Sequence, residues 1–460
     1  MKLYSENKNY KLYQGNMLDM LEVIEPETID SIITDPPYEL NFMGKGWDNS
    51  GIAFQPSTWQ KCYEVLKPGG YLLAFGGSRT FHRIACAIED AGFEIRDTIM
   101  WLYGSGFPKS MNIGLMMDKK NGIDNRTGNI VKGVGSNNTN SMKNGLGESQ
   151  EFAPEYEERK ATNEWAGWGT ALKPSFEPII VARKPFKSSL VDNVIKNGVG
   201  GINIDECRVG NEELHNSYAG NKNSGFTSGD TRDEKGKGMF AGNKEGETIV
   251  NGRFPANTIL TYDETDFDEV CGGFPISETH SMGNKETAKS TGMFGVGNIT
   301  NMNRISSKGS ASRYFYCAKA SKKDRDEGLD TFIEEKVNDG RQTPIDNAFQ
   351  RGETLRKNTH PTVKPCDLMQ YLVRLVTPHG GIVLDPFNGS GSTGKAVMYE
   401  NKERDSNYKY IGIELTEEYL PIAKARIEYV CKDNNSIESL KENTEEVIEG
   451  QTSIFDFIGE

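Results

Sequence analysis

Hydrophobic and polar positions alternate in the manner of an α/β protein in two blocks of the chain, one near each end. In the first block, residues 1–105, the short apolar runs at 30–34 and 71–75 predict buried strands. Residues 81–88 then place apolar side chains at helical spacing, which predicts an amphipathic helix.

The second block, residues 356–431, repeats this pattern more regularly. Residues 381–385 and 410–414 predict two strands, with a helix after each of them. Because short strands alternate with helices, the spacing predicts a doubly wound, mostly parallel sheet of the Rossmann-like kind.

The region between the two blocks, residues 106–355, has a different composition. It is rich in Gly, Asn, Ser and Lys, with islands of order expected at 176–182 and 254–260. Loops of this length are typically either functional or disordered, and we favour a functional insertion because α/β blocks flank it on both sides. Both ends of the chain are therefore expected to form one domain that carries a loop-rich insertion.

The composition of the 460 residues fits a cytoplasmic globular protein. Hydrophobic residues make up 36% and charged residues 26%, and no apolar run approaches the ~20 residues that a membrane span needs. The first residues contain no signal-peptide core. The seven cysteines form no Cys-x-x-Cys pair and the histidines show no metal spacing, so we expect neither a disulfide framework nor a metal site.

The net charge of −13 does not exclude a nucleic-acid partner, because phosphate contacts need only a local basic surface. The segment 304–325 is such a candidate, since Asp324 is its one acidic residue. Its basic residues are Arg304, Lys308, Arg313, Lys319, Lys322, Lys323 and Arg325. An ordinary solvated surface is the alternative interpretation of this segment.

A glycine-rich turn at 385–394 is the first candidate for chemistry. It follows a predicted strand and precedes a predicted helix, a setting that lets a ligand approach the backbone closely. The acid at the strand end, Asp385, and the acid that ends the next strand, Glu414, suit the hydroxyls of a ribose. The turn lacks the Gly-Lys-Ser/Thr ending of a phosphate loop. A tight turn without a ligand is the alternative.

The second candidate is Asp35-Pro36-Pro37-Tyr38, at the end of the strand predicted at 30–34. The amine of a nucleic-acid base is a poor nucleophile, because its lone pair is delocalised into the ring. The Asp35 carboxylate and a backbone carbonyl, held outward by consecutive prolines, can accept both amine hydrogens and favour a pyramidal nitrogen. Tyr38 offers a ring face to an extruded base. Alone, the tetrapeptide is equally well explained as a strand-to-turn connection.

Taken together, the two motifs resemble those of the DNA amino-methyltransferases, which make N6-methyladenine or N4-methylcytosine from S-adenosylmethionine. In that family the catalytic motif is Asp/Asn/Ser-Pro-Pro-Tyr/Trp/Phe. The resemblance implies a cofactor site formed by Asp385, Pro386, Phe387, Asn388, Gly389, Gly391 and Glu414.

Two further segments follow the same family. His360-Pro361-Thr362-Val363-Lys364-Pro365 resembles a signature that implies contacts of Thr362 and Lys364 to the methionine end of the cofactor. Near residues 15–19 the family often has Gly-Asp, whereas Asn16 stands at the acidic position here, so Asp19 is a second candidate for the cofactor adenine.

The order of the motifs resembles the beta arrangement, also found in phage and orphan site-specific methylases and in restriction–modification systems. It implies a catalytic half at 1–105, a target-recognition region at 106–355 and a cofactor half at 356–431. Double-stranded DNA is the partner that it implies, and a second copy of the chain is a candidate partner.

Adenine is the target we favour, because Asp-Pro-Pro-Tyr accompanies adenine more often than cytosine in this family. N4-cytosine methylation is the alternative, since the amine chemistry is the same. RNA or protein-amide methylation would fit a chain with the cofactor motif first. A non-catalytic DNA-binding protein on the same scaffold is a rival from another class.

The tail, residues 432–460, is acidic and ends in Gln451-Thr452-Ser453-Ile454-Phe455. This pattern resembles peptides that bind bacterial sliding clamps, where an extended peptide inserts apolar side chains into a pocket. A tail that folds back on its own domain is the alternative.

Overall fold

The computed structural model describes residues 2–40, 48, 50–103, 110–132, 155–216, 248–261, 323–336 and 355–438, and short strands between 276 and 317. A ten-stranded sheet forms the centre of the described part of the chain. Its order is β1 (Lys2–Glu6), β2 (Tyr10–Gln14), β20 (Lys409–Glu414), β19 (Ile382–Asp385), β3 (Ile29–Thr34), β4 (Leu66–Phe75), β8 (Phe176–Arg183), β5 (Glu94–Tyr103), β11 (Thr258–Thr261) and β16 (Tyr316–Cys317).

The middle of this sheet is parallel. Strands β2, β20, β19, β3 and β4 run in one direction, while β1 pairs with β2, and β8 with β4 and β5, in antiparallel fashion. Strands β5, β11 and β16 are parallel to one another. The predicted mostly parallel α/β sheet is thus confirmed.

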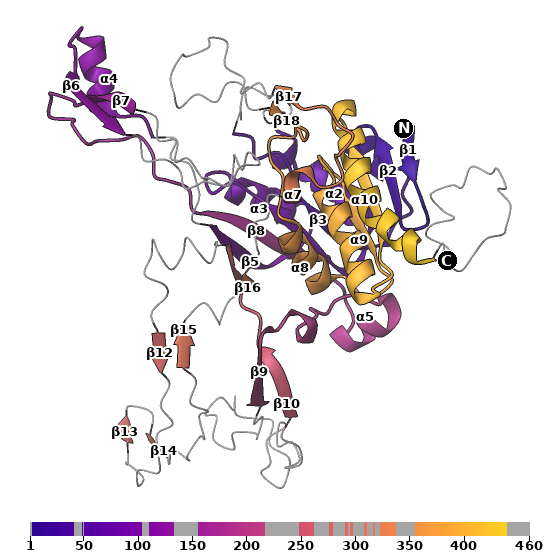
Figure 1. Ribbon diagram of the computed structural model, residues 1–460. Helices are drawn as coiled ribbons and strands as arrows, with labels where there is room; N and C mark the ends of the chain where they lie inside the picture. Colours follow the sequence, from indigo (N-terminus) through magenta and orange to yellow (C-terminus); the bar gives the residue numbers. More distant parts are fainter. Residues whose placement is uncertain are drawn as a thin grey trace.

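Helices cover both faces of the sheet. On one face lie α1 (Met17–Leu21), α2 (Pro56–Val65) and α3 (Phe81–Asp90), and on the other α8 (Cys366–Val376), α9 (Ser392–Arg404) and α10 (Leu420–Glu438). Figure 1 shows α8, α9 and α10 side by side in front of the sheet. Because both faces are covered, neighbouring residues of one strand enter opposite cores: Ile32 packs with α2 and α3, and Ile33 packs with α8.

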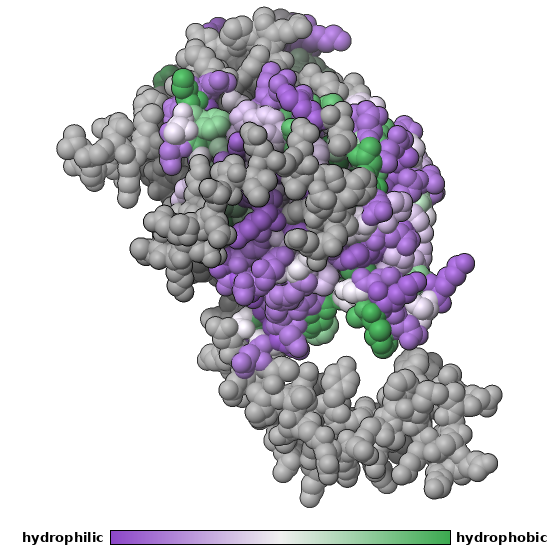
Figure 2. All heavy atoms as spheres, turned by 90° about the vertical axis from the view of Figure 1, so that its right-hand side faces the viewer, coloured by the Kyte–Doolittle hydropathy of each residue, from purple (hydrophilic) through white to green (hydrophobic). Residues whose placement is uncertain are grey.

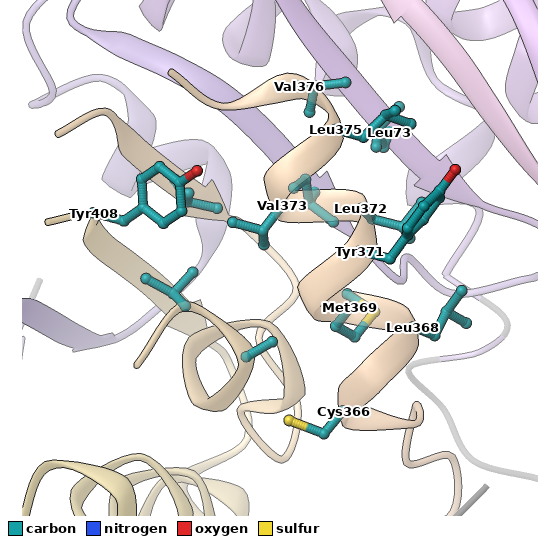
Figure 3. Close-up of a cluster of buried hydrophobic side chains, with 14 of the residues drawn as sticks. Leu73, Cys366, Leu368, Met369, Tyr371, Leu372, Val373, Leu375, Val376 and Tyr408 are labelled. Atoms are coloured by element: carbon teal, nitrogen blue, oxygen red, sulfur yellow. The ribbon is translucent and has the colours of Figure 1, made fainter. Parts of the chain in front are cut away.

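The core between the sheet and α8 is the larger of the two apolar cores. Figure 3 shows part of it. Leu368, Leu372 and Val376 are buried there at helical spacing. Cys366, at the start of α8, is buried in the same cluster, and its thiol is packed among apolar side chains.

The direction of the connections reverses between β3 and β19. Strand β3 connects through α2 to β4 on one side, whereas β19 connects through α9 to β20 on the other. In open α/β sheets the crevice at such a reversal, at the carboxyl ends of the strands, is where ligands bind. The fold therefore places residues 35–38 and 385–394 at one crevice.

Part of the region between the two blocks belongs to the sheet. Strand β8 inserts between β4 and β5 because residues 178–182 are apolar and buried, and β11 extends the sheet beyond β5. The expected border at residue 105 therefore does not separate the sheet from the inserted region. An arm of α4 (Ile113–Lys120), β6 (Arg126–Lys132) and β7 (Glu155–Arg159) projects from the sheet, at the upper left of Figure 1.

The remaining elements are short. They are η3 (Ile52–Phe54), α5 (Leu190–Asn197), η4 (Asp205–Cys207), β9 (Val209–Asn216), β10 (Thr248–Arg253), β12 (Ile276–Glu278), β13 (Ser290–Gly292), β14 (Gly295–Gly297), β15 (Lys308–Ser310), α7 (Lys323–Asp326), β17 (Glu335–Lys336), β18 (Leu355–Arg356) and η6 (Glu417–Tyr419). Among the coloured residues of Figure 2, hydrophilic ones predominate on the face shown. None of the helices described is both long and apolar enough to span a bilayer.

Candidate active site

A cavity of about 1180 Å³ opens at the carboxyl ends of β2, β20, β19 and β3. It is lined by most of the residues that the sequence predicts for a site. These are Asp35, Pro36, Pro37, Tyr38, Thr362, Lys364, Asp385, Pro386, Phe387, Asn388, Gly389 and Glu414. Two blocks more than 300 residues apart thus contribute to one cavity.

The carboxylate of Asp35 lies just beyond the end of β3, in contact with two donors. The Tyr38 hydroxyl donates to Oδ1 at 2.8 Å, and Nζ of Lys364 lies 2.9 Å from Oδ2. Burial raises the pKa of Asp35 above its usual value, although Lys364 and Tyr38 oppose this effect. A carboxylate whose pKa is raised is a better acceptor for a proton taken from a substrate.

A second carboxylate, which the sequence did not single out, faces the same donors. Oε2 of Glu177, near the start of β8, lies 3.1 Å from Nζ of Lys364 and 3.0 Å from the Tyr38 hydroxyl, which can donate its single hydrogen to either Asp35 or Glu177. Its Oε1 accepts from the Tyr103 hydroxyl at 3.4 Å. The one signal in the sequence is a lone acid before an apolar run, which is compatible with many roles.

Lys364 is almost fully enclosed: its side chain is 7% exposed, and its Nζ lies 5.3 Å from the ring centre of Tyr38 and 4.8 Å from that of Phe75. Burial lowers the pKa of Lys364, but the nearby charges of Asp35 and Glu177 more than offset this, and the pKa is raised above its usual value. Lys364 is therefore positively charged, and its ammonium group contacts Asp35 and Tyr38 of the Asp-Pro-Pro-Tyr motif. The resemblance had placed it at the methionine end of the cofactor.

Asp385, at the end of β19, is buried and fully hydrogen-bonded. Oδ1 accepts from the hydroxyl of Thr34 at 2.7 Å and from the backbone N–H of Phe387 at 3.1 Å, and Oδ2 accepts from the hydroxyl of Thr393 at 2.6 Å. Burial raises the pKa of Asp385 to about 7 in spite of these bonds. The residue thus ties the turn after β19 to β3 and to the start of α9.

Glu414, at the end of β20, holds the same turn from the other side. Oε2 accepts from the backbone N–H of Gly389 and Oε1 from that of Thr416, both at 2.7 Å. Burial raises the pKa of Glu414. Each carboxylate oxygen has a second lone pair, so Glu414 can still accept hydrogen bonds from hydroxyls in the cavity.

The glycines of the turn keep space that side chains would fill. Gly389 has φ +51, and a Cβ on it would lie 2.8 Å from Nε2 of His360. Gly391, which is not a lining residue, has φ +74, and a Cβ there would meet Ala423 at 3.0 Å. Gly389 therefore leaves room for the His360 ring beside the cavity, whereas Gly391 allows α10 to pack closely.

The loop before α8 completes this side of the cavity. Nδ1 of His360 lies 2.9 Å from the carbonyl oxygen of Thr362, and its ring contacts Tyr419 edge to face. Burial lowers the pKa of His360 to about 3, so the ring is neutral. Arg325 donates to the carbonyl oxygens of Asn358 and His360 at 3.4 and 3.2 Å, so it supports this loop.

Asn16, and not Asp19, reaches the cavity from the N-terminal block. Asn16 lines the cavity and caps α1 by accepting from the N–H of Leu18 at 3.0 Å. Asp19 is exposed on α1 and is not among the lining residues, which corrects its expected position. The physical reason is the helix that starts at Met17, which turns Asp19 outward while Met17 and Met20 are buried.

Two aromatic residues of the inserted region are not among the residues that line the cavity. Trp165 and Trp168, which could pack in a core or stack on bases, form an edge-to-face pair at 5.2 Å and are exposed at 37% and 59%. Most of the basic segment 304–325 and the peptide 451–455 lie outside the described residues. In the described ranges no group of three or more His, Cys, Asp or Glu side chains is arranged to hold a metal ion.

Comparison with protein families gives a match over most of the chain. A family model described as DNA methylase matches residues 29–425. The type II methyltransferase M.HindIII of Haemophilus influenzae is 28% identical over an alignment of 235 residues that covers 42% of this chain and 64% of M.HindIII. M2.LlaDCHI of Lactococcus lactis is 30% identical over 120 residues, 22% of this chain and 44% of that protein. The chain thus spans less than two thirds of these curated relatives.

Similar solved structures are more distant in sequence. The PvuII DNA methyltransferase, described as cytosine-N4-specific, is 13% identical with a TM-score of 0.38, over 94% of this chain and 93% of that one. M1.HpyAVI in complex with SAM is 14% identical with a TM-score of 0.34, over 91% and 98%.

Proposed function

Because this chain belongs to the DNA methylase family with N6- and N4-directed members, we propose that it methylates the exocyclic amine of a base in double-stranded DNA. The methyl donor is S-adenosylmethionine. The observation that carries the proposal is the cavity shared by Asp35 and the turn after β19, which the Thr34–Asp385 hydrogen bond holds together.

The residues around the turn fit the donor. Glu414 would accept hydrogen bonds from the ribose hydroxyls, and Phe387, Asn16 and Gly389 line the same part of the cavity. Thr362 lines the cavity on the α8 side and would contact the methionine end. When bound, S-adenosylmethionine supplies a methyl carbon from its sulfonium, whose sulfur keeps the electrons of the broken bond.

The Asp-Pro-Pro-Tyr motif would prepare the base. The base leaves the duplex and stacks on Tyr38, and its amine donates one hydrogen to Asp35 and one to the carbonyl of Pro36. The nitrogen lone pair then forms the new bond to the methyl carbon. The positive charge that develops on nitrogen is relieved when a proton passes to Asp35, whose raised pKa favours its acceptance.

Adenine N6 is the target that we propose. The carboxylate of Asp35 is a stronger hydrogen-bond acceptor than the serine found in many N4-cytosine enzymes of the family. The resemblance of residues 35–38 to the adenine type supports this choice. Cytosine N4 is the alternative, because the same pair of acceptors serves either amine.

Recognition of the DNA sequence is assigned to parts of residues 106–355. The arm of α4, β6 and β7 joins the cavity through Thr170–Lys173, and exposes Trp165 and Trp168. Exposed aromatic rings on this arm are suited to stacking on bases.

The test is the chemical analysis of DNA from cells that express the protein. Mass spectrometry of the digested DNA should show N6-methyladenine above the level of an empty-vector host, and single-molecule sequencing should place it in one sequence context. N4-methylcytosine instead would select the alternative. Wild-type protein that yields neither base, and does not bind S-adenosylmethionine in calorimetry, would favour a non-catalytic DNA-binding role.

A further inference from the structure

Both oxygens of the Asp35 carboxylate already have donors in this structure. The Tyr38 hydroxyl occupies Oδ1 at 2.8 Å and the Lys364 ammonium occupies Oδ2 at 2.9 Å. A bound ammonium draws electron density from a carboxylate and stabilises its charged form. Asp35 is then a weaker acceptor for an amine hydrogen and a weaker base for the proton that follows it.

The two donors on Asp35 also touch a second carboxylate. Oε2 of Glu177 lies 3.1 Å from Nζ of Lys364 and 3.0 Å from the Tyr38 hydroxyl oxygen. Either donor can leave Asp35 and keep one hydrogen bond to a charged acceptor. Both sets of contacts exist together in this structure.

Lys364 needs this second carboxylate because it has little access to water. Its side chain is 7% exposed and lies between the rings of Tyr38 and Phe75. A buried ammonium that loses its only carboxylate is strongly destabilised. With Glu177 present, Lys364 can release Asp35 without such a loss.

Resting on the function proposed above, we propose that Glu177 is a positioning residue that draws the Lys364 ammonium away from Asp35 when the target amine enters. Asp35 then accepts the amine hydrogen and afterwards the proton, while Glu177 holds the ammonium. The Tyr103 hydroxyl, 3.4 Å from Oε1, orients Glu177 for this task. Glu177 touches neither reacting atom in this scheme and acts through Lys364.

A double-mutant cycle tests this role. We expect Glu177→Gln to lower kcat by roughly 10- to 100-fold, since a charged hydrogen bond is lost at the step that frees Asp35. In a Lys364→Met background, where no ammonium has to be moved, the same Glu177→Gln change should lower kcat by less than about threefold. Equal losses in the two backgrounds would overturn the proposal.

Further measurements separate positioning from folding and from the proposed function. Glu177→Gln should keep the wild-type Tm within a few degrees, and its Kd for S-adenosylmethionine within about twofold. Glu177→Asp keeps the charge and should retain more turnover than the Gln variant; equal turnover would contradict the inference.

Glu89→Gln, which changes an exposed acid on α3, is the matched control and should behave as wild type. An inactive wild type would contradict the proposed function, whereas an active wild type with additive losses contradicts only the role of Glu177.

Discussion

The hydroxyl of Thr34 donates a 2.7 Å hydrogen bond to the carboxylate of Asp385, although the two residues are 351 positions apart in the chain. Thr34 is the last residue of β3 and directly precedes Asp35, and Asp385 is the last residue of β19 and begins the glycine-rich turn. One buried bond therefore sets the spacing between the proposed catalytic motif and the proposed cofactor turn.

Removing the hydrogen bond between Thr34 and Asp385 should destabilise the fold. Thr34→Val keeps the side-chain shape but removes the donor from a buried carboxylate, so we expect a loss of about 1–3 kcal/mol in the free energy of unfolding. Chemical denaturation would measure it. Thr28→Val, which removes an exposed bond to the carbonyl of Glu25, should cost less than about 1 kcal/mol. Equal costs would show that the Thr34–Asp385 bond has no special role.

Loss of the Asp35 carboxylate should abolish methyl transfer and leave donor binding measurable. In Asp35→Ala the amine loses its charged acceptor, and kcat should fall by about 1,000-fold or more. Turnover with radiolabelled S-adenosylmethionine and calorimetric titration give the two readouts. Asp90→Ala, at an exposed position at the end of α3, serves as the control. Turnover retained in Asp35→Ala would remove this residue from the mechanism.

A methyl group at residue 389 should displace the His360 ring, which lines the cavity, and so weaken donor binding. In Gly389→Ala the new Cβ would meet Nε2 of His360 at 2.8 Å, at a backbone φ of +51. Gly122→Ala has a similar φ of +71 but no atom within 4 Å of the new Cβ, so it carries the backbone strain alone, about 1 kcal/mol. Calorimetry should show weaker binding of S-adenosylmethionine by at least about tenfold for Gly389→Ala and unchanged binding for Gly122→Ala. Equal affinities of the two variants for S-adenosylmethionine would mean that the His360 ring can move aside without affecting the cavity.

The raised pKa of Asp385 predicts a stability that depends on pH. The carboxyl group has a pKa of about 7 in the fold, against an ordinary value of 3.8, so between these values the folded protein binds more protons than the unfolded chain. This group therefore stabilises the fold less as the pH rises from about 4 to about 7. Asp385→Asn stays neutral, and its stability relative to wild type, measured by denaturation at several pH values, should increase over that window. A difference that does not change with pH would show that Asp385 is ionised throughout.

Sequence patterns predict those parts of the site that depend on local structure. Residues 35–38 and 385–389 follow short apolar runs that form strands, and the ends of parallel strands meet at one edge of the sheet. Their meeting in one cavity was therefore predictable, although their chemical roles remain proposals.

Other parts depend on pairings that no local pattern encodes. Glu177 reaches the cavity because β8 inserts antiparallel between β4 and β5, a choice set by long-range packing. Nζ of Lys364 lies 2.9 Å from Asp35 and 3.1 Å from Glu177, and no pattern near residue 364 predicts this pairing. Asp19 was predicted to contact the cofactor adenine because of the family resemblance. The helix that begins at Met17 instead turns its side chain outward.

The position of β19 between β3 and β20 has a consequence for how the protein is made. Strand β3 leaves the ribosome early, yet its neighbour on one side is synthesised about 350 residues later. Until then that edge of β3 offers unpaired backbone groups to any other extended chain. One edge of β3 must therefore stay unpaired while about 350 further residues are synthesised, and a chaperone that binds extended chain would protect that edge.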